Sequence, residues 1–172
     1  MQKTLIGLYI GRFQPLHLGH LSAVKQALKE ADELIIGIGS AQYHHTPENP
    51  FTVEERQKMI ELGLKEAGIW EKCRIYHIPD IHNNEKWVEH VQSLVPPFEL
   101  TYVGETGLVK ALFEKAKLPI HMVQKEIDIS ATAIRKALAE GGEWKSYLSP
   151  GVVQFLESIQ VTERLKKQHP DH

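Results

Sequence analysis

Short apolar runs alternate along the chain with longer segments in which apolar residues recur every three or four positions. The first run, residues 5–10, predicts a strand. After it, apolar residues recur every three or four positions at Leu18, Leu21, Val24 and Leu28, and this spacing predicts one buried face of a helix. Further apolar runs predict strands at residues 33–40, 73–78, 100–104 and 120–123. Parallel neighbours need crossover helices, so this alternation favours a parallel sheet. We predict an α/β fold, a three-layer, doubly wound Rossmann-like parallel sheet of about five strands with additional C-terminal helices.

Helix signals dominate the segments between and after these runs. Thr52 and Glu55 have the spacing of a capping box, which predicts a helix start. In the helix after the fourth strand, we expect four residues to face inward: Leu108, Leu112, Phe113 and Ala116. Near the C-terminus, Ser149 and Pro150 predict the start of a last helix with one apolar face: Val152, Phe155, Leu156 and Ile159. The charged tail, 163–172, predicts a mobile end.

Residues 41–51 predict a loop, because Pro47, Asn49 and Pro50 interrupt regular structure. Such a loop is either a plain connector or a lid over bound phosphates, and the sequence leaves both interpretations open.

Composition limits the class of protein. The chain has 172 residues, 42% of them hydrophobic and 24% charged, with a formal net charge of −2. We predict one domain, residues 1–172, with a helical C-terminal end, since a globule of this size buries roughly 70% of its unfolded surface. The near-neutral charge argues against nucleic-acid or anionic-membrane partners.

Cysteine content and hydropathy favour a cytoplasmic protein. Cys73 is the single cysteine, which excludes an intramolecular disulfide and is compatible with a reducing compartment. No apolar stretch approaches the ~18 residues of a membrane span, and the first residues lack the pattern of a signal peptide.

The segment from Gly11 to His20 carries the strongest chemical signal: Gly-Arg-Phe-Gln-Pro-Leu-His-Leu-Gly-His. It follows the first predicted strand, at the end where open α/β sheets bind ligands. His17 and His20 are expected in the first turn of the next helix, where unpaired N–H groups and the helix dipole attract anions. Together with Arg12, the two imidazoles predict a phosphate site.

The histidine pair has two other interpretations. A metal site needs a third ligand and usually a His-Glu-x-x-His arrangement, which this segment lacks. A purely structural pair is plausible for an isolated His-x-x-His, but it is less so beside an arginine at a strand end.

A second segment, 129–135, reads Ile-Ser-Ala-Thr-Ala-Ile-Arg. Ser130 suits a helix N-cap, and the helix is expected to end near 141–142. Taken alone, the segment is a well-capped helix with an exposed Arg135; its helix start also makes an anion site, where a guanidinium can grip phosphate oxygens.

A third segment, 79–84, leaves the third strand as a polar loop and is followed by Trp87 in a helix. A tryptophan in a first helical turn usually packs on the sheet. From the residues alone, that interpretation is preferred.

The Gly11–His20 segment resembles the (H/T)xGH signature of the nucleotidyltransferase α/β-phosphodiesterase superfamily. Its longer form is similar to that of the archaeal-type nicotinamide-mononucleotide adenylyltransferases. The second segment resembles the superfamily's Ser-x-Thr-x-Ile-Arg signature, and the resemblance runs from Leu5 to about Arg164.

The resemblance implies an enzyme that transfers the adenylyl group of ATP to nicotinamide mononucleotide (NMN), giving NAD and pyrophosphate. It implies Mg²⁺ carried by the ATP phosphates, no metal ligands from the protein, and a homo-oligomer, since family members commonly form hexamers or other homo-oligomers.

The resemblance also assigns site residues. The catalytic residues would be Arg12, His17, His20 and Arg135. ATP would be bound by these four and by Gly11, Gly104, Ser130 and Thr132. NMN would be bound by Gly39, Ser40, Asp80, Asn84 and Trp87, with the indole stacked on the cationic ring.

Two rival functions remain from the sequence. One is a transferase of the same superfamily acting on phosphopantetheine, flavin mononucleotide or an alcohol phosphate. The other is a non-catalytic nucleotide sensor on the same fold.

Overall fold

The computed structural model describes residues 3–168, which form two compact units. The first unit comprises residues up to 12, 22–41 and 71–126, and the second comprises 13–21, 42–70 and the residues from 127 onward. The single domain expected over residues 1–172 stays a prediction. No helix within the described residues is long and apolar enough to cross a membrane.

The first unit is built on a parallel sheet of five strands in the order β3-β2-β1-β4-β5. The strands are β1 (Ile6–Gly11), β2 (Glu33–Gly39), β3 (Cys73–Ile78), β4 (Leu100–Val103) and β5 (Ile120–Met122). All four pairings are parallel, so the predicted α/β class and strand count are confirmed. From β1 the chain first adds β2 and β3 on one side of the sheet and then β4 and β5 on the other. The strand order therefore reverses between β1 and β4, at the topological switch point where open α/β sheets bind ligands.

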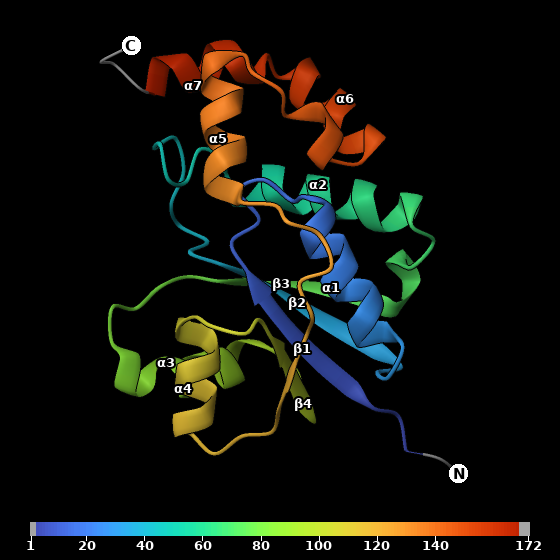
Figure 1. Ribbon diagram of the computed structural model, residues 1–172. Helices are drawn as coiled ribbons and strands as arrows, with labels where there is room; N and C mark the ends of the chain where they lie inside the picture. Colours follow the sequence, from blue (N-terminus) through green and yellow to red (C-terminus); the bar gives the residue numbers. More distant parts are fainter. Residues whose placement is uncertain (1–2, 169–172) are drawn as a thin grey trace. The chain divides into compact units, whose positions relative to one another are not determined.

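Helices cover both faces of this sheet. α3 (Asn84–Leu94) and α4 (Leu108–Lys115) pack side by side on one face (Figure 1). Residues 22–28 of α1 (Leu18–Leu28) lie on the opposite face, which makes the unit three-layered. The core under α3 and α4 consists of Leu8, Ile35, Ile78, Val88, Val91, Val95 and Phe113.

The inward face expected for α4 is only partly correct. Phe113 is fully buried and Leu112 is partly buried, but Leu108 is 59% exposed and Ala116 is exposed. Ala116 is the C-cap of this short helix, and Leu108 begins it at the edge of a cavity. A helix of two turns therefore buries only its middle.

The second unit contains α2 (Val53–Glu66), α5 (Ala131–Glu140), α6 (Pro150–Ser158) and α7 (Val161–Gln168). α2 packs against α6, and α5 packs against α7. Two 3₁₀ turns, η1 (Trp70–Lys72) and η2 (Lys145–Tyr147), complete the described elements outside the sheet and its helices. The predicted capping box is confirmed: Thr52 Oγ1 accepts from the Glu55 N–H, and Glu55 Oε1 accepts from the Thr52 N–H.

The sequence prediction missed α7. We expected a charged tail from residue 163 that is mobile at its end, but the chain turns at Gln160, which has a φ of 53°, and forms another helix. Half of its eight residues are charged, yet Val161 and Leu165 are buried one turn apart. These two residues form the apolar face of the helix. The end of the expected tail, 169–172, lies outside the described residues.

We predict that Gly7→Ala destabilises the first unit by about 1–3 kcal/mol, the usual cost of overpacking. A Cβ at Gly7 would lie 2.5 Å from Cε2 of the buried Tyr102 ring, which is rigid. Thermal or denaturant unfolding measures the effect. Gly39→Ala is the control, because its nearest heavy atoms would lie 3.7 Å away; equal stability of the two variants would contradict the prediction.

Candidate functional site

A cavity of about 410 Å³ opens in the first unit, at the carboxyl ends of β1, β2 and β3 and at the starts of α3 and α4. Its volume lies within the range of small-molecule sites. Seven residues assigned from the sequence line it: Gly11, Arg12, Gly39, Ser40, Asp80, Asn84 and Trp87. The structure thus brings all five residues assigned to NMN into one cavity, together with Gly11 and Arg12, which were assigned to ATP.

The polar wall of the cavity is pre-arranged. Ser40 Oγ donates a 2.8 Å hydrogen bond to Asp80 Oδ2, which ties the end of β2 to the loop after β3. Ser40 has a φ of 48°, an uncommon conformation for a non-glycine residue. A fixed carboxylate can accept hydrogen bonds from an amide or ribose hydroxyl of a ligand.

The apolar wall combines an indole with aliphatic side chains. The Trp87 ring meets Phe113 edge-to-face, with centroids 6.0 Å apart. Packing and ligand contact are therefore compatible: the ring is held by the core while it also lines the cavity. The sequence interpretation missed six lining residues, which lie at the ends of the same strands or at the starts of the helices that follow: Ile10, Ile81, His82, Asn83, Leu108 and Val109.

Gly104 lies elsewhere. It follows β4 and is exposed, and it is not among the residues that line the cavity.

The histidine pair belongs to the second unit. The rings of His17 and His20 stack with centroids 3.7 Å apart and an interplanar angle of 21°. The His20 ring also contacts Phe13, at 4.8 Å. The expected common face of the two imidazoles is therefore present.

The environment of the helix start differs from expectation. His17 lies just before α1 rather than in its first turn. Its Nδ1 accepts hydrogen bonds from the N–H groups of Gly19 (3.1 Å) and His20 (3.3 Å), and His20 Nδ1 accepts from the His17 N–H (3.1 Å). The expectation of unpaired N–H groups is wrong for these three residues, because the imidazoles themselves cap the helix.

These bonds define the proton positions on both rings. A nitrogen that accepts from an N–H group carries no proton, so each neutral ring carries its proton on Nε2. Burial lowers the pKa of His17 to about 4, and burial together with the charge of a protonated His17 lowers the pKa of His20 well below its usual range. At neutral pH the pair therefore presents two uncharged Nε2–H donors.

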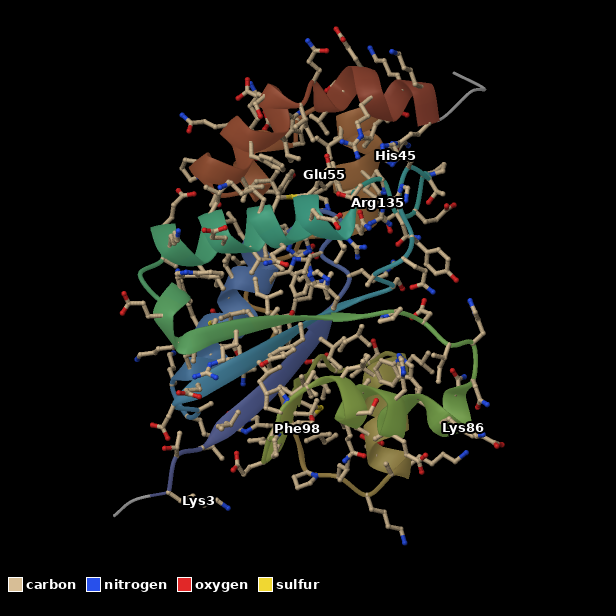
Figure 2. The ribbon with its side chains drawn as sticks, turned by 180° about the vertical axis from the view of Figure 1, so that it is seen from behind. Lys3, His45, Glu55, Lys86, Phe98 and Arg135 are labelled. Atoms are coloured by element: carbon tan, nitrogen blue, oxygen red, sulfur yellow. The ribbon has the colours of Figure 1, made fainter. Side chains whose placement is uncertain are left out.

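Arg135 approaches the same segment from α5 and is buried, not exposed as the helix-cap interpretation assumed (Figure 2). Its Nη1 donates to the carbonyl oxygen of Gln14 (3.1 Å), three residues before His17, and its Nη2 donates to Thr132 Oγ1 (3.2 Å). Ser130 caps α5 as predicted, with Oγ accepting from the Ala133 N–H. The structure thus brings both signature segments of this unit together.

The loop at 41–51 is tied to this region. The Gln14 side chain accepts from the Phe51 N–H (2.9 Å) and donates to the Phe51 carbonyl (3.1 Å). Pro47 and Glu48 line a cavity of about 210 Å³ with Thr132 and Arg135. The loop therefore borders the second signature, where the connector and lid interpretations both still apply.

The metal interpretation of the histidine pair gains no support. Within residues 3–168, no group of three or more His, Cys, Asp or Glu side chains is arranged to hold a metal ion. Cys73 is buried, and burial raises the pKa of its thiol to about 11, which fits inert packing.

Comparisons with known proteins agree with this geometry. The family model for cytidylyltransferase-like proteins matches residues 8–137. The nicotinamide-nucleotide adenylyltransferase of Methanothrix thermoacetophila is 42% identical over 163 residues, which are 93% of this chain and 94% of that protein.

Two crystal structures of a bifunctional NMN adenylyltransferase/ADP ribose pyrophosphatase from Francisella tularensis share the fold. One has a TM-score of 0.83 at 26% identity, and the other, complexed with AMP and a manganese ion, has a TM-score of 0.79 at 27% identity. Each match covers 96% of this chain and 52% of the other, so the chain spans about half their length.

The family model covers most of the chain, and the Methanothrix relative matches nearly all of it at an identity well above chance. The chain belongs to the archaeal-type nicotinamide-nucleotide adenylyltransferases, within the cytidylyltransferase-like family.

Proposed function

We propose that this protein transfers the adenylyl group of ATP to NMN, giving NAD and pyrophosphate. The observation that carries the proposal is the stacked pair of Nε2–H donors beside a buried arginine, in a chain of this family. Neutral donors and guanidinium groups are suited to holding phosphates.

The reaction requires no covalent intermediate on the enzyme. A 5′-phosphate oxygen of NMN attacks the α-phosphorus of ATP, and the bond from that phosphorus to the α–β bridging oxygen breaks. Pyrophosphate leaves with the bonding electrons. Holding two reactants in register can supply about 7–11 kcal/mol, so positioning accounts for most of the catalysis without a general base.

In this proposal, residues of the second unit hold the triphosphate. The Nε2–H groups of His17 and His20 donate to phosphate oxygens, including the bridging oxygen on which charge grows. Protonating either Nδ1 would break the hydrogen bonds that it accepts from the backbone. The rings therefore act as neutral donors, and Arg135 supplies positive charge. Ser130, Thr132 and the first amides of α5 receive the phosphate tail.

Residues of the first unit hold NMN in the 410 Å³ cavity. Trp87 stacks on the pyridinium ring, a cation over an aromatic face. Asp80 and Asn84 accept from or donate to the carboxamide and ribose, while Gly39 and Ser40 allow close approach. Arg12 adds a positive charge to the same cavity and contacts phosphate.

Mg²⁺ fits this proposal as a companion of the substrate. Mg²⁺ usually binds through substrate phosphates, waters and one or two carboxylates, and the described residues offer no cluster of ligands for a resident ion. Bound to the triphosphate, it would neutralise charge on the leaving pyrophosphate.

The acceptor is the point on which rival functions differ. A curated relative at 42% identity that is named for nicotinamide nucleotide supports NMN over phosphopantetheine, flavin mononucleotide and alcohol phosphates. Both signatures are intact, which argues against a non-catalytic sensor. A cytoplasmic location, a homo-oligomer and the absence of nucleic-acid partners stay predictions from the sequence.

The direct experiment mixes the purified protein with Mg²⁺, ATP and NMN and follows pyrophosphate and NAD together. We expect both products in equal amounts. For comparison, turnover is also measured with flavin mononucleotide or phosphopantetheine as the acceptor and with CTP as the donor. Faster turnover with any of these than with NMN and ATP would contradict the proposal, as would binding without turnover.

We predict that His20→Asn lowers kcat by about 10²–10³-fold, the usual cost of one lost donor to a developing anion. The Asn oxygen can replace Nδ1 as the acceptor from the His17 N–H, whereas the Nε2–H donor is lost. His20→Gln is the matched control, because its amide nitrogen can take the place of Nε2, and we expect a smaller loss. Near-normal turnover by a folded His20→Asn variant would count against the assignment.

We predict that Trp87→Ala raises KM for NMN by about 2- to 30-fold, as expected for a lost cation–π contact. KM for ATP should remain close to that of the wild type, and Trp87→Phe should have an intermediate effect. Steady-state kinetics with each substrate varied in turn makes the measurement. An equal rise in both KM values would show that Trp87 acts through stability alone.

We predict that the wild type loses unfolding free energy as the pH falls from 7.5 to 5, and that His17→Asn loses about 2 kcal/mol less. The folded state holds the pKa of His17 near 4, below the 6.5 of the unfolded chain, so protons bind the unfolded state first. This part of the stability is present above pH 6.5 and disappears as the pH falls. Urea unfolding at both pH values tests it; identical pH dependence in both proteins would refute it.

A further inference from the structure

The Arg164 side chain of α7, the helix that the sequence did not predict, contacts both α2 and the loop before α2. Arg164 on α7 makes a forked ion pair with Glu55 on α2: Nη2 donates to Oε1 at 2.7 Å, and Nη1 donates to Oε2. Nη2 also donates to the carbonyl oxygen of Pro50 at 2.8 Å. The guanidinium lies 5.6 Å from the centre of the Phe51 ring. One side chain thus grips α2 and the loop that precedes it.

Phe51 connects the contacts of Arg164 to Gln14, in the segment that carries His17 and His20. Its side chain is fully buried, and both of its backbone polar groups are bonded to the Gln14 amide. Gln14 is itself 2% exposed, and its carbonyl accepts from Arg135. Hydrogen bonds on both sides of the Pro50–Phe51 peptide therefore link Arg164 to Gln14, three positions before His17.

We propose that Arg164 is a positioning residue for the histidine pair: α7 holds residues 50–51, which hold Gln14 and with it the segment that carries His17 and His20. The role assigned to that segment rests on the proposed function. The contacts that hold the segment are present before any substrate binds.

The chemistry of the pair favours a geometric role over a purely stabilising one. A partly buried ion pair is weak evidence for stability, because desolvation offsets much of the attraction. A forked guanidinium, however, fixes distance and direction to two partners at once, which a lysine cannot do. The pair is intact at neutral pH: burial opposes ionisation of Glu55, but bonds from Arg164 and from the Thr52 N–H outweigh it, so its pKa lies below the usual value.

The variants separate the contacts of Arg164. Arg164→Ala removes all of them, and Arg164→Lys keeps a positive charge near Glu55 but loses the fork. Glu55→Gln keeps an oxygen for the capping box with Thr52 while removing the charge. Lys167→Ala on the same helix is the control, since Lys167 is exposed.

Hydrogen exchange of the unliganded protein is the first measurement, and it does not depend on activity. In Arg164→Ala we expect the Phe51, Gly19 and His20 amides to exchange at least about tenfold faster, with α6 amides changed less. Lys167→Ala should match the wild type. An equal rise in the exchange rates at Phe51, at Gly19 and His20, and in α6 would overturn the proposal, because it would show loss of stability alone. No increase at these amides would overturn it as well.

Kinetics is the second measurement. We expect Arg164→Ala to lower kcat/KM for ATP by about 10- to 100-fold, as misplacement of about 1 Å can do, with KM for NMN within about twofold. Arg164→Lys should lie between the wild type and Arg164→Ala. A folded Arg164→Ala or Glu55→Gln variant with wild-type kcat and KM for ATP would overturn the proposal.

The two measurements keep the proposals apart. If the wild type forms no NAD, the proposed function fails, and hydrogen exchange alone decides the role of Arg164. If Arg164→Ala does not fold, Arg164→Lys and Glu55→Gln are measured in its place. Unchanged exchange at Phe51 and His20 in both would then refute the inference.

Discussion

The second unit depends on the way Gln14 is held. Its side-chain amide uses both its donor and its acceptor on the backbone of Phe51, and its carbonyl accepts from Arg135. A buried amide that lost one of these partners would leave polar groups unsatisfied, so the arrangement is strongly preferred over its alternatives. Since His17 follows three residues later, the same bonds limit where the imidazoles can lie.

The structure leaves both histidine rings uncharged while each keeps one N–H donor. Each Nδ1 accepts from backbone N–H groups at the start of α1, which leaves the proton on Nε2. Burial makes the charged form costly, and the low pKa of His17 reflects that cost. The guanidinium beside this segment belongs to the buried Arg135. The cavity of the first unit is lined by different groups, an indole that packs on Phe113 and a carboxylate that accepts a hydrogen bond from Ser40.

Much of the fold could be predicted from local pattern. The five strands, the helix from Leu18 to Leu28 and the capping box at Thr52 and Glu55 all appear as expected. Each depends on residues close in sequence, so periodicity and capping chemistry are enough. The errors occur where burial depends on distant partners. Leu108 has the period of a core residue but lies at the edge of a cavity, and the buried Leu165 lies in the charged segment, 163–172, that was expected to be a tail.

The candidate site divides in the same way. The sequence alone singled out the groups that are proposed to carry the chemistry, because the order of Gly11, Arg12, His17 and His20 and the run from Ser130 to Arg135 are local signatures with a chemical meaning. Only the tertiary structure decided their protonation state and their support. The tautomer depends on which N–H groups meet Nδ1, and the support of Gln14 by Phe51 spans 37 residues. The contact of Arg164 with Glu55 spans 109 residues. Such contacts cannot be predicted from the periodicity of the sequence, because hydrogen bonds between distant segments depend on how the chain packs and not on the spacing of residues along it.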